Sequence, residues 1–119
     1  MTKKASLWDV MGLKDRKTSV FWIFYSVVEA EESNFPRYDA FCDAIEDNTD
    51  HHWPGDTSFF LVRSTLPIRE LAQAISKPLD LNVDTLLIGH LDSGEVIHVG
   101  NAPNLEILAD LLPAAKPLA

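Results

Sequence analysis

Long apolar runs alternate with amphipathic stretches along this chain, and the alternation predicts its secondary structure. From Ser19 to Glu29 the residues are apolar almost without interruption, and β-branched and aromatic side chains predominate. This composition predicts a strand, and the lack of alternation predicts that both of its faces are covered. A helix follows, with Pro36 in its first turn, Ser33 or Asn34 as its cap and Asn48 near its end. Its apolar stripe consists of Phe35, Tyr38, Phe41, Cys42 and Ile45.

The region 51–91 contains a predicted hairpin, a second helix and another strand. Turn residues at 54–56 separate a short strand at 51–53 from a longer strand over 58–63. The second helix begins around Pro67, because proline is favoured in a first helical turn. Its core-facing positions are Ile68, Leu71, Ala72 and Ile75, and Pro78 ends it.

The C-terminal third predicts a hairpin and a last helix. A strand over 85–91 turns at 92–94 into a strand over 95–99. We expect Asn101 to cap the last helix and the segment 114–119 to be a loose tail. The apolar stripe of that helix consists of Leu105, Ile107, Leu108, Leu111 and Leu112.

This order of elements predicts an α+β fold, a ferredoxin-like βαββαβ sandwich with an extra strand and a C-terminal helix. We divide the chain into an N-terminal extension at 1–18, one ferredoxin-like domain at 19–113 and the tail at 114–119. Within the extension, residues 6–13 are expected to form one to two helical turns. A chain of 119 residues has room for one domain with a real core.

The predicted topology places the first strand inside the sheet and both helices on one face. The apolar strands then need a cover for the other face, and a face-to-face homodimer supplies it, because large apolar side chains stabilise a protein by about 1.5–3 kcal/mol when buried. The sequence does not decide which face of the first strand would be used. The interface candidates are Phe21, Trp22, Ile23, Phe24, Tyr25, Phe59 and Phe60.

Composition and charge limit the classes of partner. The net charge is −8, with nine acidic residues and one basic residue in 29–56, and five basic residues in 1–18. Because binding to phosphate backbones needs clustered lysine and arginine, the main body is not expected to bind nucleic acid. No apolar run is long enough to cross a membrane. A single cysteine excludes an internal disulfide, and we expect a cytoplasmic protein.

The residues that could carry chemistry do not form a recognisable constellation, and no cofactor is predicted. Adjacent His51 and His52 would point to opposite faces of a strand, whereas His90 and His98 could lie diagonally across a hairpin. Such a pair lacks a third metal ligand, so structural or surface roles are favoured. Cys42 is expected to be a buried, inert thiol. No histidine is adjacent to Ser26, Ser58 or Ser64, and the five glycines are isolated, so neither a serine hydrolase nor a phosphate-binding loop is predicted.

Four short stretches in the segment 52–91 match the pattern of a known family. They are Trp53, the strand start Thr57-Ser58-Phe59, the helix sequence Ile68-Arg69-Glu70-Leu71 and the strand sequence Asp84-Thr85-Leu86-Leu87-Ile88. On these residues the segment resembles the SinR-like group, which is related to the CRISPR-associated ferredoxin-like endonucleases and to virulence-associated protein D. In architecture the likeness covers roughly residues 20–112. It implies a ferredoxin-like homodimer and, in some relatives, metal-dependent cleavage of nucleic acid.

One departure from the nuclease pattern bears on activity. Nuclease members that resemble this chain carry an aspartate at the end of the first strand, usually after an aromatic residue, whereas here Tyr25 is followed by Ser26. A hydroxyl does not replace a carboxylate as a ligand for a hard divalent cation. The next acid, Glu29, is about 10 Å further along an extended strand. We therefore carry over no catalytic residue, and Glu29 and Asp92 are the weak metal candidates.

Three functions follow as hypotheses. The first is a non-catalytic homodimeric module for protein interaction or regulation. The second is a divergent metal-dependent nuclease that uses Glu29 or Asp92. The third is a small-ligand binder on the open face of the sheet, with pocket residues such as Trp22 and Phe24.

Overall fold

The computed structural model describes residues 18–28, 36–54 and 58–118, and its elements follow the predicted order. Those elements are β1 (Ser19–Ser26), α2 (Pro36–Asn48), β2 (His51–Trp53), β3 (Phe59–Ser64), α3 (Ile68–Ser76), β4 (Thr85–His90), β5 (Val96–Gly100), α4 (Leu105–Leu111) and β6 (Ala115–Pro117). The fold is α+β, with a six-stranded mixed sheet. No helix in the described ranges is long and apolar enough to cross a membrane.

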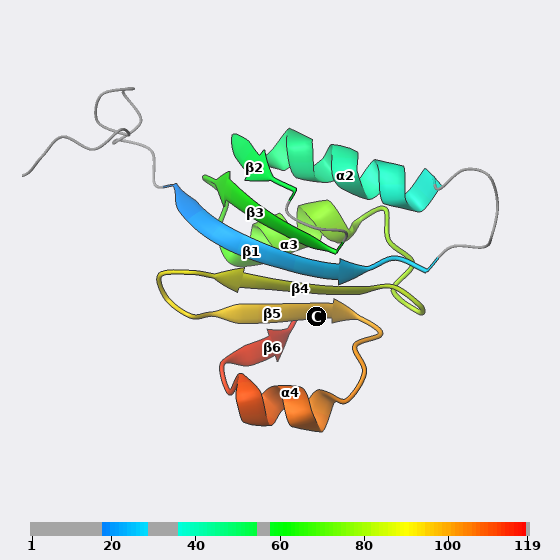
Figure 1. Cartoon of the computed structure of the whole chain (residues 1–119), viewed down its shortest axis with the longest axis vertical. Coiled ribbons are helices and arrows are strands. Elements are labelled where there is room, and N and C mark those ends of the chain that lie inside the picture. Colours follow the sequence, from blue (N-terminus) through cyan, green and yellow to red (C-terminus); the bar gives the residue numbers. More distant parts are fainter. Residues whose placement is uncertain (1–17, 29–35, 55–57, 119) are drawn as a thin grey trace, which may run out of the picture.

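The strands lie side by side in the order β2-β3-β1-β4-β5-β6 (Figure 1). The prediction that the first strand is internal is confirmed, because β1 pairs antiparallel with both β3 and β4. The hairpins β2–β3 and β4–β5 are also antiparallel, as predicted. Among the described strands, β5 and β6 form the one parallel pair.

Helices α2 and α3 cover one face of the sheet, and the core lies between them and β1, β3, β4 and β5. Phe41 and Ile45 are the fully buried residues of α2. The predicted apolar positions of α3, Ile68, Leu71, Ala72 and Ile75, are all buried. Because they recur at helical spacing, one side of α3 meets the sheet while its other side stays in water.

Strand β1 is shorter than predicted, and the described part of the chain covers only one of its faces. It ends at Ser26, and its residues alternate between buried and more exposed. Ile23 is completely buried under the helices, whereas the side chain of Phe24 is 53% exposed. Among the described residues, the continuous apolar run of β1 thus has one buried face and one partly exposed face.

Two predictions for the C-terminal region are wrong. Asn104, in the left-handed conformation, occupies the cap position of α4 instead of Asn101, and its side chain makes no capping hydrogen bond. The expected loose tail contains β6, which pairs with β5 from Val96 to His98. The expected short helix at 6–13 and the predicted caps Ser33 and Asn34 lie outside the described residues.

Candidate functional site

The face of the sheet opposite α2 and α3, here called the open face, carries a row of aromatic side chains. The row consists of Trp53 on β2, Phe59 on β3 and Phe24 on β1. Phe24 is directly across from Phe59, with ring centroids 6.4 Å apart, and the centroids of Phe59 and Trp53 are 6.5 Å apart. Both contacts are edge-on, a favourable arrangement for aromatic pairs. Trp53 is nevertheless 58% exposed, so this aromatic row is not covered by the described part of the chain.

The indole of Trp22 lies on the same face, above the backbone of Gly89. The two residues are paired across β1 and β4. A β-carbon at position 89 would collide with the Trp22 ring, so only glycine leaves room for the ring in this place. A glycine inside a strand often marks such a close approach, and this signal was present in the sequence.

A groove of about 750 Å³ lies between the open face and the segment that contains α4. Its floor is formed by Trp22, Phe24 and Leu87, and its opposite wall by Leu108 and Leu112. The other residues that line this sheet groove are Tyr25, Ser26, Ser58, Thr85, Asn101, Ala102 and Pro103. Its size is in the range of about 300–1,000 Å³ that is typical of small-molecule sites.

The polar residues of the sheet groove gather at one end. Ser26 ends β1 and is paired with Thr85, which begins β4. Thr85 donates its hydroxyl hydrogen to the carbonyl oxygen of Asn101 at 2.8 Å, and this bond fixes the loop after β5. Ser58 is at the same end, because its carbonyl oxygen accepts a hydrogen bond from the Tyr25 amide. This end therefore offers uncharged hydroxyl and amide groups.

Helix α4 forms the outer wall of the sheet groove but is itself weakly packed. None of its residues is buried. Leu108 and Leu112 are half-buried toward the groove, whereas Leu105 and Ile107 are exposed and Leu111 is 74% exposed. Of the predicted apolar stripe, only Leu108 and Leu112 are partly buried by the described part of the chain.

The structure divides the predicted interface residues into two groups. Phe21, Ile23, Tyr25 and Phe60 are buried between the sheet and the helices, so they do not reach the surface. Trp22, Phe24 and Phe59 lie on the open face and remain candidates. Tyr25 is held in the core, where burial and a hydroxyl contact with Tyr38 raise its pKa.

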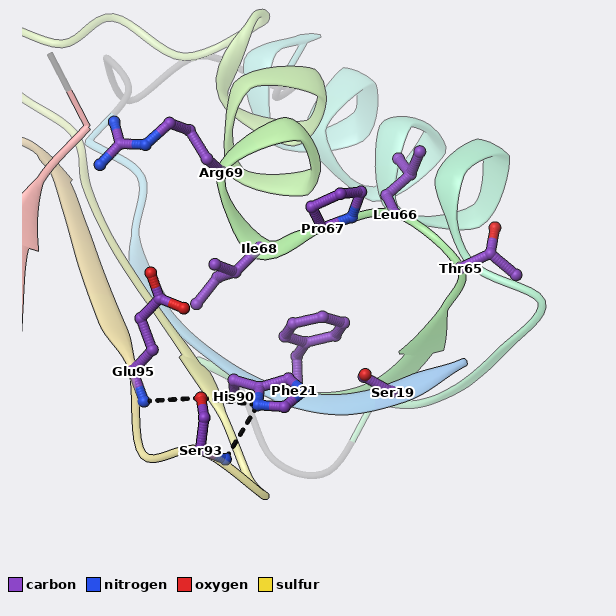
Figure 2. Close-up of a pocket in the computed structure, with 10 residues that line it drawn as sticks. All are labelled: Ser19, Phe21, Thr65, Leu66, Pro67, Ile68, Arg69, His90, Ser93 and Glu95. Carbon is purple, nitrogen blue, oxygen red and sulfur yellow. Dashed lines mark hydrogen bonds between the residues drawn. The ribbon is translucent and has the colours of Figure 1, made fainter. Parts of the chain in front are cut away.

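A second hollow, of about 560 Å³, lies between the turn after β4 and the start of α3 (Figure 2). The imidazole Nδ1 of His90 accepts a hydrogen bond from the Ser93 amide at 3.0 Å and lies 2.8 Å from the Ser93 hydroxyl oxygen. That hydroxyl oxygen also accepts from the Glu95 amide at 3.1 Å. The contacts join residues of one tight turn, so they stabilise the hairpin. Among the residues drawn around His90, no third side chain orients its ring as in a catalytic triad. The sequence analysis missed the pairing of His90 with Ser93.

Asp84 is a completely buried carboxylate that joins three segments. It accepts hydrogen bonds from the amides of Val28 at 2.7 Å and Asp80 at 2.8 Å, and from Arg37 Nε on α2 at 3.1 Å. Arg37 also donates to the Val28 carbonyl oxygen. Burial alone would raise the pKa of Asp84, but the Arg37 and amide hydrogen bonds outweigh it and hold the pKa below its ordinary value. Because both of its oxygens are occupied by donors, Asp84 has a structural role.

The other residues that were considered for chemistry from the sequence do not come together in one site. His90 and His98 do not meet, because His98 shares the open face with Leu87 whereas His90 contacts Phe21 on the covered face. Cys42 is a free, half-buried cysteine, and burial raises the pKa of its thiol, which disfavours the reactive thiolate. In the ranges that the structure describes, no three histidine, cysteine or acidic residues come together as a metal site. Asp92 is exposed in its turn, and Glu29 lies outside the described residues.

Comparisons with protein-family models, with curated proteins and with solved structures find no match for this chain.

Proposed function

We propose that this protein is a non-catalytic homodimeric module for interaction or regulation, in which two chains associate through their open faces. The observation that carries the proposal is the aromatic row of Trp53, Phe59 and Phe24, in which Trp53 and Phe24 are more than half exposed. Exposed apolar patches of this kind mark interaction surfaces in soluble proteins. Trp and Tyr, with other aromatic residues, are also enriched at the centres of interfaces.

Charge at this face does not oppose a second copy as its occupant. The chain has a net charge of −8, but the aromatic row contributes no charge, so two copies can meet there without burying like charges. Arg63, on the same face, donates to Asp50 at 2.7 Å and is therefore already compensated. A row that crosses β2, β3 and β1 can also pack against its own copy around a two-fold axis.

The strand order supports a finer description of the fold. The order β2-β3-β1-β4, with antiparallel neighbours and helices after β1 and β3, agrees with a ferredoxin-like βαββαβ arrangement extended by β5, α4 and β6. The resemblance to the SinR-like group belongs to the same proposal. A cytoplasmic location is also proposed, because the one cysteine is a free thiol.

Light scattering at micromolar concentration tests the dimer. The native chain is expected to have about twice its mass of 13.3 kDa, and Phe24→Glu and Trp53→Glu are expected to give folded monomers. Gln73→Glu is the matched control, because it adds the same charge on the exposed side of α3 and leaves the dimer intact. A native monomer, or charged variants that remain dimeric, would overturn the proposal.

A metal-dependent nuclease is the alternative that the resemblance suggests. Ser26 stands at the end of β1, where the related nucleases carry a carboxylate, and this observation makes the alternative weaker. Magnesium- or manganese-dependent cleavage of RNA or DNA that is lost in Glu29→Ala or Asp92→Ala would favour it over the non-catalytic module.

A small-ligand binder is the second alternative, and the sheet groove favours it. The groove and the aromatic row share Phe24 but otherwise occupy different halves of the open face. Because both use Phe24, a ligand that covers its ring would compete with a partner chain for that part of the open face.

A further inference from the structure

We propose that the sheet groove binds an elongated, uncharged apolar molecule that carries a neutral hydrogen-bonding head group. This proposal names the ligand class of the second alternative above. It does not depend on the proposed dimer, because the groove lies between β1, β4 and α4, whereas the aromatic row extends from β1 toward β2.

The distribution of side chains sets the orientation of the ligand. The register of β1 and β4 places Ser26 beside Thr85 at one end and Trp22 beside Gly89 at the other. These positions are four residues apart on β1, a distance of about 13 Å along a strand. A ligand with its head near Ser26 would therefore extend a chain of that length over Phe24 and Leu87 toward Trp22.

The head group is inferred from the polar residues. Ser26, Ser58 and Asn101 can each donate and accept hydrogen bonds, and they are all neutral. The described residues that line the groove include no lysine, arginine or histidine. A carboxylate or phosphate would therefore lose its water without gaining a cation, which is costly. An alcohol or amide would keep its hydrogen bonds at no such cost.

The apolar part is inferred from the surfaces that the ligand would cover. Phe24 is more than half exposed, and Leu108 and Leu112 on the far wall are only half-buried. An alkyl chain between floor and wall would remove both from water. Since α4 has no buried residue of its own, the wall can adjust to its occupant without breaking core contacts.

The test uses two probes of equal length that differ only in the head group, 1-decanol and decanoate. In a Trp8→Phe, Trp53→Phe background, Trp22 is the one remaining tryptophan, and its fluorescence reports occupancy of the groove. We expect a saturable change with 1-decanol and an affinity for decanoate at pH 7 that is about tenfold weaker or worse.

Two variants locate the binding. Ala102→Phe adds bulk to the wall from a loop position and is expected to abolish the 1-decanol signal. Asn101→Ala is expected to weaken 1-decanol and to reduce the difference between the two probes. Absence of a saturable signal, equal affinity for both probes, or undiminished binding by Ala102→Phe would each overturn the proposal.

The same titration with Trp53→Glu, in a Trp8→Phe background, separates this proposal from the dimer. If a monomeric Trp53→Glu chain still bound 1-decanol, this result would support the groove as the ligand site, whether or not the native chain forms a dimer. If 1-decanol bound only to a dimeric chain, the groove of a single chain would not be the site, and the proposal would be overturned.

Discussion

The two faces of the sheet are built from the same strands, but one is buried under helices and the other is partly exposed. On the covered face, Ile23 of β1 is completely buried beneath α2 and α3, and the core is continuous. On the open face, the next residue along, Phe24, is 53% exposed, and among the described helices only the weakly packed α4 lies nearby. The apolar content is similar on both sides, so the difference lies in what packs against each face.

The helices show the same contrast. α3 buries five of its nine residues, whereas α4, also apolar, buries none. Burial of an apolar stripe stabilises a short helix more than its intrinsic propensity does. The covered face therefore contributes most of the burial that stabilises the described helices, whereas the apolar surface of α4 and of the open face stays partly exposed.

The largest expected effect comes from adjacent truncations on the two faces. Ile23→Ala should lower the free energy of unfolding by about 2–5 kcal/mol, because it leaves a cavity in the core. Phe24→Ala should lower it by less than about 1 kcal/mol in dilute protein, because more than half of the residue is already exposed to water. Urea denaturation monitored by circular dichroism measures both. Equal losses would contradict the contrast between the faces.

The second effect concerns Asp84 and its dependence on pH. Asp84→Asn should cost about 2–4 kcal/mol, because the amide cannot accept all of the donors that the buried carboxylate accepts. In the native chain the folded-state pKa lies below the ordinary value of 3.8, so this contribution is complete at neutral pH. It should be lost as the pH falls below that value.

Unfolding measured at several acidic pH values checks this prediction. The free energy of unfolding of the native chain should fall between neutral pH and the most acidic pH measured. That of Asp84→Asn should fall less over the same range. Asp92→Asn, in the exposed turn, is the control and should behave like the native chain. If Asp84→Asn lost as much stability as the native chain over this pH range, the proposed role of Asp84 would be contradicted.

How far the sequence could predict this molecule differs between the same two regions. Proline positions and helical spacing predicted α2 and α3, because prolines restrict the backbone locally and the stripe of α3 is fully used in the core. Turn residues likewise predicted both hairpins. The sequence alone could not show that Phe24 is exposed and Ile23 is buried, because both belong to one unbroken apolar run. Only the tertiary packing distinguishes them.

The groove was harder to predict. A continuous run such as that of β1 gives no period from which its exposed side could be identified. The polar end of the groove arises because Ser26, Thr85 and Asn101 come together through strand pairing, although they are far apart in the chain. The strand β6 was missed because it has three residues and includes Pro117, which is a poor strand former.

A smaller effect is expected where the open face packs most closely. Gly89→Ala should cost about 1–3 kcal/mol, because the added methyl group displaces the Trp22 indole. In a Trp22→Ala background the same change should cost much less, and a double-mutant cycle measures the difference. A cost that is unchanged by Trp22→Ala would mean that the two residues are not coupled.

The smallest effect is expected on α4. Leu111→Ala should change the free energy of unfolding by less than about 0.5 kcal/mol, because the side chain is 74% exposed. The amides of α4 should also exchange with solvent much faster than those of α3, since local opening breaks few contacts. Hydrogen exchange followed by mass spectrometry compares the two helices. Equal protection would show that α4 is held as firmly as the core.

The outermost strands bear on aggregation. Unpaired strand margins can recruit further chains and extend into fibrils, and proteins avoid this with short strands, prolines and lysines. At one margin of the sheet, β2 has three residues and is followed by Pro54; at the other, β6 also has three residues, which include Lys116 and Pro117. Both ends thus resist open-ended polymerisation through strand addition. The association proposed above uses the broad open face instead, where two copies that pack face to face would form a closed dimer.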